Sequence, residues 1–334
     1  MADDSKRTGA LTIADVARHA GVSRAVVSRA LSPEPRPVSA DKRERVLKAA
    51  AELGFKPNFL AQSLVSKSVN LIAVVVNHIH DFSDLDLFDP LLERVQSTGK
   101  QVIIIRVGSV ARVEEFLRQG IAYHVDAALV FSDFADAATV REMFHSDRVV
   151  MLNGRHDRLS PAVIPDEAKG IAEAVADAAA KGVRRAALLT GRETSEIERA
   201  RIGFYRANLQ RAGISILREV RGDYSYRSGH TAADALVSGE PPDAVFCTSD
   251  SMAMGVLDAR RADFPDHRPQ RFRLYGFDNL SLLDIDAYPI SSIGYDKGEY
   301  VDRIVDILSE PENSFGRSGE PILVPTRFVP RATA

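Results

Sequence analysis

The sequence contains one cysteine, Cys247, among its 334 residues, so an internal disulfide framework is excluded. That residue lies in the apolar segment AVFC, which favours a buried thiol in a core strand over a nucleophile. The first residues, MADDSKRTG, include no apolar leader, and no run approaches the ~20 apolar residues of a membrane span. We therefore expect a cytoplasmic protein with a reduced thiol and no membrane partner.

The sequence also lacks the short motifs of common enzyme classes. It has no G-x-S-x-G nucleophile elbow, no G-x-x-x-x-G-K-[ST] phosphate loop and no G-x-G-x-x-G after a strand. We therefore predict no catalytic residue and no cofactor. The segment NHIHDFSDLDLFD contains several possible metal ligands, which are His78, His80, Asp81, Asp84 and Asp86. Because no H-x-x-x-H spacing and no cysteine accompanies them, a solvated polar loop is the better interpretation, and no metal site is predicted.

Charge and length indicate more than one domain. At 334 residues with 45% hydrophobic residues, the chain is long enough for several cores. Residues 1–70 contain 12 Lys and Arg against 7 Asp and Glu, a balance of +5, while the whole chain carries −3, so residues 71–334 carry −8. A basic head on an acidic body is typical of a protein that binds nucleic acid through one part only.

The pattern of residues 12–31 predicts two short helices. Thr12 is expected to cap the first, with Asp15 favouring its positive end. Gly21 ends that helix and Ser23 caps the second. The apolar stripes are Ile13, Val16, Ala17 and Ala20 in the first helix, and Val26, Val27, Ala30 and Leu31 in the second. Two helices joined by a short turn with glycine predict a helix-turn-helix.

The second helix of such a motif presents its N-terminal residues to the DNA major groove. The residues that point outward here are Arg24, Ala25, Ser28 and Arg29. The alternative is an ordinary helical hairpin with a solvated basic face. A third helix follows the cap Ser39, and Lys42, Arg43 and Arg45 on it are expected to reach DNA phosphates.

Residues 57–66 begin with Pro57 and predict a short helix, which is marginal in water by itself. A segment of this kind suits a hinge that becomes helical on DNA. Leu64 within it has the apolar character of a minor-groove wedge.

These segments resemble the LacI/GalR (lactose-repressor) family of transcriptional regulators. The motif T-I-x-D-V-A-x-x-A-G-V-S-x-x-x-V-S-R starts at Thr12, V-S-x-x-x-R-x-x-V starts at Val38, and P-N-x-x-A-Q-x-L starts at Pro57. The resemblance implies that the start of the second helix reads bases and that the hinge leucine opens the operator centre. The predicted DNA-binding residues are Thr12, Ser23, Arg24, Ala25, Ser28, Arg29, Asn58, Gln62 and Leu64.

From residue 70 onward, short apolar strands alternate with amphipathic helices in two successive sets, which predicts two α/β subdomains with parallel sheets. The predicted strands are Leu71–Val76, Val102–Arg106, Ala127–Phe131, Val149–Leu152, Ala186–Thr190, Glu219–Arg221, Ala244–Thr248 and Arg273–Gly276. The predicted helices are 88–97, 110–120, 136–145, 168–181, 198–212, 228–238 and 250–262. The resemblance implies the same body, similar to a periplasmic sugar-binding protein, with three chain crossings between the subdomains.

The expected fold is thus an all-α helix-turn-helix head piece followed by an α/β body of two parallel-sheet subdomains. The predicted domains are a DNA-binding domain at 1–56, a hinge helix or linker at 57–68, and an effector-binding and dimerisation domain at 69–334. Its two subdomains are about 69–164 with 293–325, and about 165–292 with the C-terminal end. No heptad-patterned helix follows the tail VPTRFVPRATA, so a coiled-coil tetramer is not expected.

Ligands of parallel sheets lie beyond the carboxyl ends of the strands, and two facing subdomains form a cleft there. Candidate effector contacts that follow predicted strands are Asn153, Ser249, Asp250 and Asp278. The resemblance adds Arg201, because R-I-G-F-Y-R-A-N-L resembles the family's R-L-A-G-F-R-A-A-L, whose arginine bonds effector oxygens. It also adds the aromatic residues Tyr224 and Phe88.

Five of these seven residues have a structural alternative. The alternatives are a helix cap for Asp250, a turn for Asp278, a surface position for Arg201, and core packing for Tyr224 and Phe88. The family pattern is also not followed throughout. Asn153 stands where many members carry Asp, Ser249 where they often carry Asn, and Phe204 where they usually have Gly.

Polar groups around an aromatic ring suit a sugar-like or nucleoside-like effector. We therefore predict a ligand-responsive, sequence-specific transcriptional repressor whose homodimer binds two half-sites of double-stranded operator DNA. An inducer and a co-repressor both fit, since each needs only different affinities for two body states, about 1–3 kcal/mol of coupling. Two other functions are alternatives. A solute-binding protein would need an export signal and no basic head, and a sugar-processing enzyme with a DNA-binding appendage would turn over a sugar.

Overall fold

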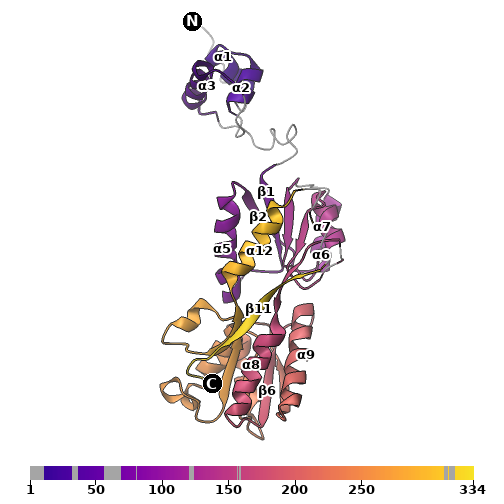
Figure 1. Ribbon diagram of the computed structural model, residues 1–334, viewed down its shortest axis with the longest axis vertical. Coiled ribbons are helices and arrows are strands. Elements are labelled where there is room, and N and C mark those ends of the chain that lie inside the picture. Colours follow the sequence, from indigo (N-terminus) through magenta and orange to yellow (C-terminus); the bar gives the residue numbers. More distant parts are fainter. Residues whose placement is uncertain are drawn as a thin grey trace. The chain divides into compact units, whose positions relative to one another are not determined.

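The fold is taken from a computed structural model that describes residues 11–31, 37–55, 69–79, 81–119, 124–155, 157, 159–311, 315 and 320–334. The chain divides into two compact units, Met1–Val69 and Asn70–Ala334 (Figure 1). The predicted hinge at 57–68 lies outside the described residues. No helix in the described ranges is long and apolar enough to cross a membrane.

The described part of the first unit contains the helices α1 (Ile13–Ala20), α2 (Arg24–Ala30) and α3 (Ala40–Leu53). The carboxylate of Asp15 accepts hydrogen bonds from the backbone nitrogen (3.0 Å) and the hydroxyl (2.6 Å) of Thr12, which fixes the start of α1. Gly21 ends α1 with a φ of 63°, a left-handed conformation that glycine adopts without steric cost. Val16, Val27 and Val46, one from each helix, are fully buried together. The predicted helix-turn-helix is confirmed.

The second unit begins with a parallel four-stranded sheet in the order β2-β1-β3-β4. Its strands are β1 (Leu71–Val76), β2 (Gln101–Arg106), β3 (Ala127–Val130) and β4 (Val149–Met151). The helices α5 (Phe82–Ser97) and α12 (Lys297–Ser309) cover one face, and α6 (Val110–Gln119) and α7 (Ala137–Phe144) cover the other (Figure 1). Alternate residues of β1 enter the two cores, so this strand is apolar throughout.

A seven-stranded sheet follows in the order β5-β11-β10-β9-β8-β6-β7. Its strands are β5 (Val163–Asp166), β6 (Arg185–Thr190), β7 (Ser215–Arg221), β8 (Ala244–Cys247), β9 (Arg273–Phe277), β10 (Ser291–Tyr295) and β11 (Ile322–Val329). All neighbours run parallel except β10 and β11. One face is covered by α8 (Glu167–Ala180) and α9 (Glu196–Arg211), and the other by α10 (Tyr226–Val237) and α11 (Asp250–Ala259). Short 3₁₀ turns are η1 (Arg261–Asp263), η2 (Pro265–His267) and η3 (Ser281–Asp284).

Three segments pass between the two subdomain cores. The strand β5 contributes Val163 to the first core and leads directly into α8 of the second. The strand β10 contributes Ile293 to the second core and leads into α12 of the first. The strand β11 buries Val324 in the first core and packs Phe328 against the second. The subdomains are therefore joined by three segments of the chain.

The structure differs from the predicted elements at the start of α5, and it adds the strands β5 and β10 and the helix α12, which the sequence did not predict. Helix α5 begins at Phe82 rather than residue 88, because Asp81 and Asp84 form a capping box in which the Asp81 amide donates to Asp84 at 3.1 Å. Much of the predicted polar loop is thus helical. Strand β10 was not expected because its Ser291 and Ser292 interrupt the apolar pattern, yet both are fully buried and hydrogen-bonded through their hydroxyl groups.

Helices α10 and α11 pack with their backbones in close approach. A Cβ atom at Gly229 would lie 2.0 Å from the carbonyl oxygen of Met252, and one at Gly255 would lie 2.1 Å from that of Tyr226. Real Cβ contacts are essentially never shorter than 3.0 Å, so glycine is required at both positions for this packing.

We predict that Gly255→Ala lowers the free energy of unfolding by about 1–3 kcal/mol, because the added methyl group separates two packed helices. Gly203→Ala is the matched control, because no heavy atom lies within 4 Å of a Cβ atom at that position of α9. That change should raise stability by about 0.5–1 kcal/mol through helix propensity alone. Urea unfolding followed by circular dichroism separates the two, and equal effects would contradict the close packing.

Candidate functional site

The second helix of the head exposes its predicted base-reading residues, which are Arg24, Ala25, Ser28 and Arg29. Val27 and Ala30, on the opposite side of α2, are buried in the head core. Ser23 caps the helix, its hydroxyl accepting from the amide of Val26 at 3.4 Å. Thr12 is exposed at the start of α1. The other predicted DNA contacts, at 58, 62 and 64, lie outside the described residues.

Two arginines of α3 bind the ends of the other helices instead of pointing only to solvent. Arg45 Nη2 donates to the carbonyl oxygens of Ala20 (2.6 Å) and Gly21 (3.3 Å) at the end of α1. Arg43 Nη1 donates to the carbonyl oxygen of Ala30 at the end of α2, at 3.1 Å. Carbonyl groups at helix ends lack intrahelical partners and attract cations. These contacts fix the turn, and the expected contacts of both arginines with DNA phosphates stay a prediction.

Arg201 of α9 is buried at the carboxyl ends of strands β8 and β9. Its Nε and Nη2 atoms form a bidentate ion pair with Glu167, at 2.9 and 2.6 Å. Its Nη1 atom donates to the carbonyl oxygen of Thr248 at 2.6 Å. The guanidinium group also lies 3.7 Å from the centroid of the Phe277 ring. The alternative of a surface arginine is therefore excluded.

The charges around Arg201 keep it protonated. Burial alone would lower the pKa of Arg201, but Glu167, Glu198 and Asp278 outweigh burial and raise it. Burial raises the pKa of Glu167, and the facing guanidinium opposes that shift. The bidentate geometry indicates a charged pair.

Glu198 lies on the same face of α9 as Arg201, next to its guanidinium group. Its Oε1 atom accepts from the backbone nitrogen of Gly191 (2.5 Å) and from the hydroxyl of Thr248 (2.7 Å). Within the described part of the chain, its Oε2 atom has no hydrogen-bond partner, and the nearest cation is Arg201 Nη1 at 3.8 Å. The ring of Tyr224 packs on Gly191, where a Cβ atom would lie 2.0 Å from Tyr224 Cε1. Tyr224 is thus placed beside Glu198, and burial, with Glu198 adding to it, raises its pKa.

Asp250 holds the loop after β9 against β10. Its carboxylate accepts from the amide of Leu280 (2.9 Å) and the hydroxyl of Ser292 (2.7 Å). Burial raises the pKa of Asp250 to about 7. The cap of α11 is Ser249, whose hydroxyl also donates to the carbonyl oxygen of Tyr224 at 3.4 Å. The alternative in which Asp250 caps that helix is therefore wrong.

Asp278 and Asn279 follow β9 with consecutive positive φ angles of 103° and 46°. Tyr224 has a φ of 74°. Non-glycine residues in this region cost of order 1–3 kcal/mol each, and such strain concentrates at ligand sites. Burial raises the pKa of Asp278, and Arg201 acts against it. The strain thus falls on two of the predicted effector contacts.

The first subdomain contributes a second polar group. Asn153 is buried after β4, with Nδ2 donating to the carbonyl oxygen of Ser132 at 2.5 Å and Oδ1 accepting from the amide of Arg155 at 3.0 Å. Asp133 accepts from Asn77 Nδ2 at 2.8 Å, and burial raises its pKa. These side chains all follow the carboxyl ends of the first sheet.

Phe88 does not join either group. It lies on α5, only 6% exposed, with its ring edge-to-face against Phe131 at 5.3 Å between centroids. This is the core-packing alternative, and its contact with an effector stays a prediction.

Several side chains bridge the two subdomains. Arg192, after β6, lies 3.0 Å from the His78 ring, after β1. Arg155 pairs with Glu196 at 3.2 Å. Asp86 of α5 accepts from both the amide and the hydroxyl of Ser281, each at 2.7 Å, and from Lys297 at 3.0 Å. Polar contacts therefore link the two subdomains at these positions.

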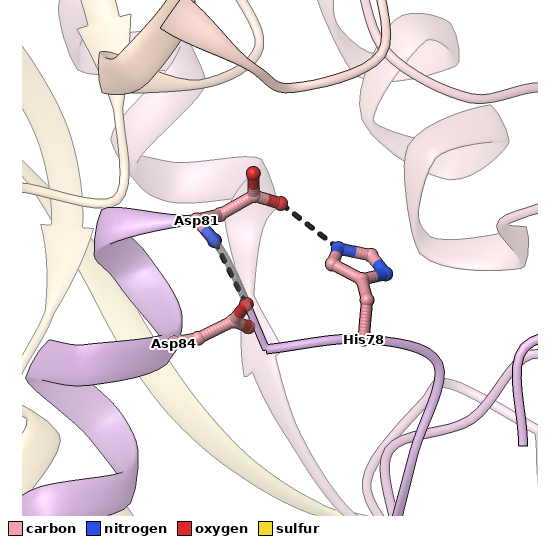
Figure 2. A group of neighbouring side chains, drawn as sticks. All are labelled: His78, Asp81 and Asp84. Atoms are coloured by element: carbon pink, nitrogen blue, oxygen red, sulfur yellow. Dashed lines mark hydrogen bonds and ion pairs between the residues drawn. The ribbon is translucent and has the colours of Figure 1, made fainter. Parts of the chain in front are cut away.

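Three possible metal ligands lie within 4.8 Å of one another at the start of α5, namely His78, Asp81 and Asp84 (Figure 2). The His78 ring points toward Asp81, 2.9 Å from its carboxylate, and Asp84 accepts from the Asp81 amide (Figure 2). The carboxylates therefore already cap the helix and hold the imidazole. The cationic Arg192 next to the same ring disfavours a metal ion, so we assign none.

Comparison with known proteins identifies the family. Residues 12–58 match the model for bacterial regulatory proteins of the lacI family, and residues 175–334 match the periplasmic binding protein-like domain. The chain is 30% identical over 305 residues to the HTH-type transcriptional repressor CytR of Escherichia coli (strain K12), covering 88% of this chain and 87% of that protein. The chain belongs to the LacI family. This confirms the predicted resemblance.

Other relatives agree. This LacI-family chain is 28% identical to catabolite control protein A of Priestia megaterium, over 85% of its length and 87% of that protein. A crystal structure of the Lac repressor dimer bound to operator and an anti-inducer has a TM-score of 0.80 at 24% identity, covering 97% of this chain and 99% of that one, which shows the shared fold. The protein is accordingly a ligand-responsive transcriptional regulator and not an enzyme.

Sequence reasoning missed the acidic partners of the LacI-family arginine. Glu167 stands at the first position of α8, directly after a strand that was not predicted. Glu198 precedes Arg201 by three residues, so helical periodicity alone places both on one face of α9. That spacing was the available signal.

We predict that Asp250→Asn removes a pH-dependent part of the stability. The pKa of Asp250 is about 7 in the folded protein, against about 3.9 in an unfolded chain. A carboxyl group with a raised folded-state pKa stabilises fully below about pH 4 and loses this contribution as the pH rises to about 7. The asparagine amide can accept from Leu280 and donate to Ser292, so the variant should fold.

Chemical denaturation at about pH 5 and about pH 8 measures the effect. The parent should lose about 2–3 kcal/mol more than Asp250→Asn between these conditions. Asp234→Asn, at a side chain that is 89% exposed, is the control and should follow the parent. Equal losses in all three proteins would show that Asp250 is ionised at both pH values.

Proposed function

We propose that this LacI-family regulator is a homodimeric repressor that binds near-palindromic double-stranded operator DNA. The observation that carries the proposal is the exposed face of α2 with Arg24, Ala25, Ser28 and Arg29, held by Arg45 in the geometry of a helix-turn-helix. Two such helices in a dimer would enter successive major grooves. The Lac repressor structure of similar fold is a dimer bound to operator. A protein with this role works where the DNA is, which places it in the cytoplasm.

We further propose that a sugar-like or nucleoside-like effector binds between the body subdomains. The support is the convergence of Asn153, Arg201, Tyr224 and Asp278 at strand ends, two of them with strained backbones. Ser249 and Asp250 hold the loops that carry these residues, and Phe88 of α5 packs in the core of the first subdomain. A transcriptional regulator CelR of similar fold was solved with cellobiose, and a Lac repressor with ONPG.

The domain boundaries follow from these roles. We assign residues 1–56 to DNA binding, 57–68 to a hinge, and 69–334 to effector binding and dimerisation. Within the last, the crossings at β5, β10 and β11 are the natural limits of the two subdomains.

Selection of DNA from a pool of random duplexes by the full chain tests the repressor proposal. We expect an enriched near-palindromic sequence, bound by two chains per duplex in sedimentation experiments. A thermal-shift screen over sugars and nucleosides then identifies the effector, whose addition should change the affinity for the selected duplex. Enrichment of no sequence, or turnover of a sugar, would overturn the proposal.

For base reading, we predict that Arg24→Ala or Arg29→Ala loses roughly 1–3 kcal/mol of discrimination between the selected duplex and a scrambled one. The reason is that an arginine fork contacts base edges, whereas phosphate contacts are the same in both sequences. Fluorescence anisotropy at fixed ionic strength measures both affinities. Lys48→Ala removes one exposed charge elsewhere in the head and should weaken both duplexes equally. The same uniform loss in an arginine variant would assign that arginine to phosphate binding.

For the effector site, we predict that Asp278→Asn weakens effector binding by about 1–3 kcal/mol, because an amide replaces the carboxyl group and changes the hydrogen bonds it can make at constant volume. DNA affinity without effector should change less than about twofold, since the head is a separate unit. This variant is a sharper probe than Arg201→Ala, which leaves Glu167 buried without its partner. Calorimetry and anisotropy on one preparation give both values. Asp286→Asn, at an exposed position, is the control, and parental effector affinity in Asp278→Asn would remove it from the site.

A further inference from the structure

The charges around Arg201 do not balance. The guanidinium group faces three carboxyl groups, those of Glu167, Glu198 and Asp278. Three carboxyl groups thus face a single cation. At so buried a position this excess is poorly screened by solvent and salt.

The donors of Arg201 are also largely occupied from within the protein. Two of its nitrogen atoms bind Glu167 and the third binds the carbonyl oxygen of Thr248. An arginine in an effector site ordinarily offers a planar fork to a carboxylate or phosphate. Here that fork is closed by Glu167, so the residue neutralises its surroundings rather than presenting a free cation.

Glu198 offers a ligand a hydrogen-bond acceptor in place of the donors of Arg201. Its side chain is fully buried, its Oε1 atom is held by Gly191 and Thr248, and within the described residues its Oε2 atom accepts no hydrogen bond. A buried acceptor without a donor costs free energy that a ligand donor recovers. Tyr224, which packs on Gly191, lies beside this carboxyl group.

Cations at the opening of the cleft do not reverse this balance. Arg155 is paired with Glu196 at 3.2 Å, and Lys297 with Asp86 at 3.0 Å. Arg192 lies over the Tyr224 ring, 5.5 Å from its centroid, and faces the buried carboxyl group of Asp133.

We propose that Glu198 sets the chemical class of the effector. The cleft binds an uncharged or amine-bearing polyhydroxylated compound that donates a hydrogen bond to Glu198 Oε2, and it rejects the corresponding carboxylate or phosphate. This inference rests on the proposed effector site, and it adds a residue and a charge preference that the LacI-family motif does not carry.

Calorimetry of the full chain with matched probes tests the class directly. The probes are D-glucosamine, D-glucose and D-glucuronate, which share a ring but differ in charge, and adenosine with adenosine 5′-monophosphate. We expect an uncharged or amine-bearing member to bind at least about tenfold more tightly than its anionic counterpart. The proposal is overturned if an anionic member binds as tightly, or if no uncharged or amine-bearing probe binds.

Glu198→Gln tests the residue. Gly191 and Thr248 both donate, so they hold the amide oxygen in place of Oε1 and leave an NH₂ group at the position of Oε2. An acceptor thus becomes a donor, one negative charge is lost, and the preference over the anionic probe should fall about tenfold or more. An unchanged preference at an unchanged melting temperature overturns the assignment. If the variant melts far below the parent, the probe series on the parent decides.

Glu240→Gln is the matched control. Glu240 pairs with Arg185 at the amino end of β6, the opposite edge of the sheet from Glu198, so the same change of charge should leave the probe preference unaltered. The DNA selected by the full chain separates the two proposals. If an anionic compound changes DNA affinity, the repressor function stands and the charge preference fails. If no DNA is selected, the function fails while calorimetry still reports the preference.

Discussion

A buried guanidinium group organises the second subdomain at the cleft. An unpaired charge in such a place costs several kcal/mol, so every element around Arg201 must supply a partner. Glu167 comes from the start of α8, the Thr248 carbonyl from the end of β8, and the Phe277 ring from the end of β9. The position of one side chain therefore fixes how α8, α9 and the carboxyl ends of β8 and β9 meet, and Asp278 stands in the loop that follows β9.

The loop after β9 connects the surroundings of Arg201 to the other subdomain. Asp278 interacts with Arg201, while the amide and the hydroxyl of Ser281, three residues later, donate hydrogen bonds to Asp86 of α5. The loop between them is anchored by Asp250 and has strained backbone angles at Asp278 and Asn279. A ligand that changes this loop would alter the contact with α5, which packs on the first sheet. A change at Asp278 would therefore reach the contact with α5 through a short covalent path.

The sequence predicted the architecture well because periodicity and capping are local. Thr12, Gly21 and Ser23 mark the helix limits where the structure has them. The site was predicted less completely, because local sequence patterns do not indicate which distant side chains form hydrogen bonds or ion pairs in the folded protein. Arg201 was recognised from its motif, but not that Glu167, thirty-four residues earlier, would close its fork. Strand β10 was missed since its buried serines bond to groups distant in sequence, and Phe88 resembled a ligand contact although its ring lies in the core.

The arginines that hold the turn of the head also bear on how binding responds to ionic strength. Each phosphate neutralised by a free side chain releases condensed counterions, so log K falls with log salt by about 0.9 per contact. Arg45 and Arg43 direct guanidinium nitrogens to the carbonyl oxygens of Ala20 and Ala30 and contribute correspondingly less to that release. The number of counterions released on DNA binding should therefore be smaller than the number of basic residues in the head, because some of these residues stabilise the fold of the head.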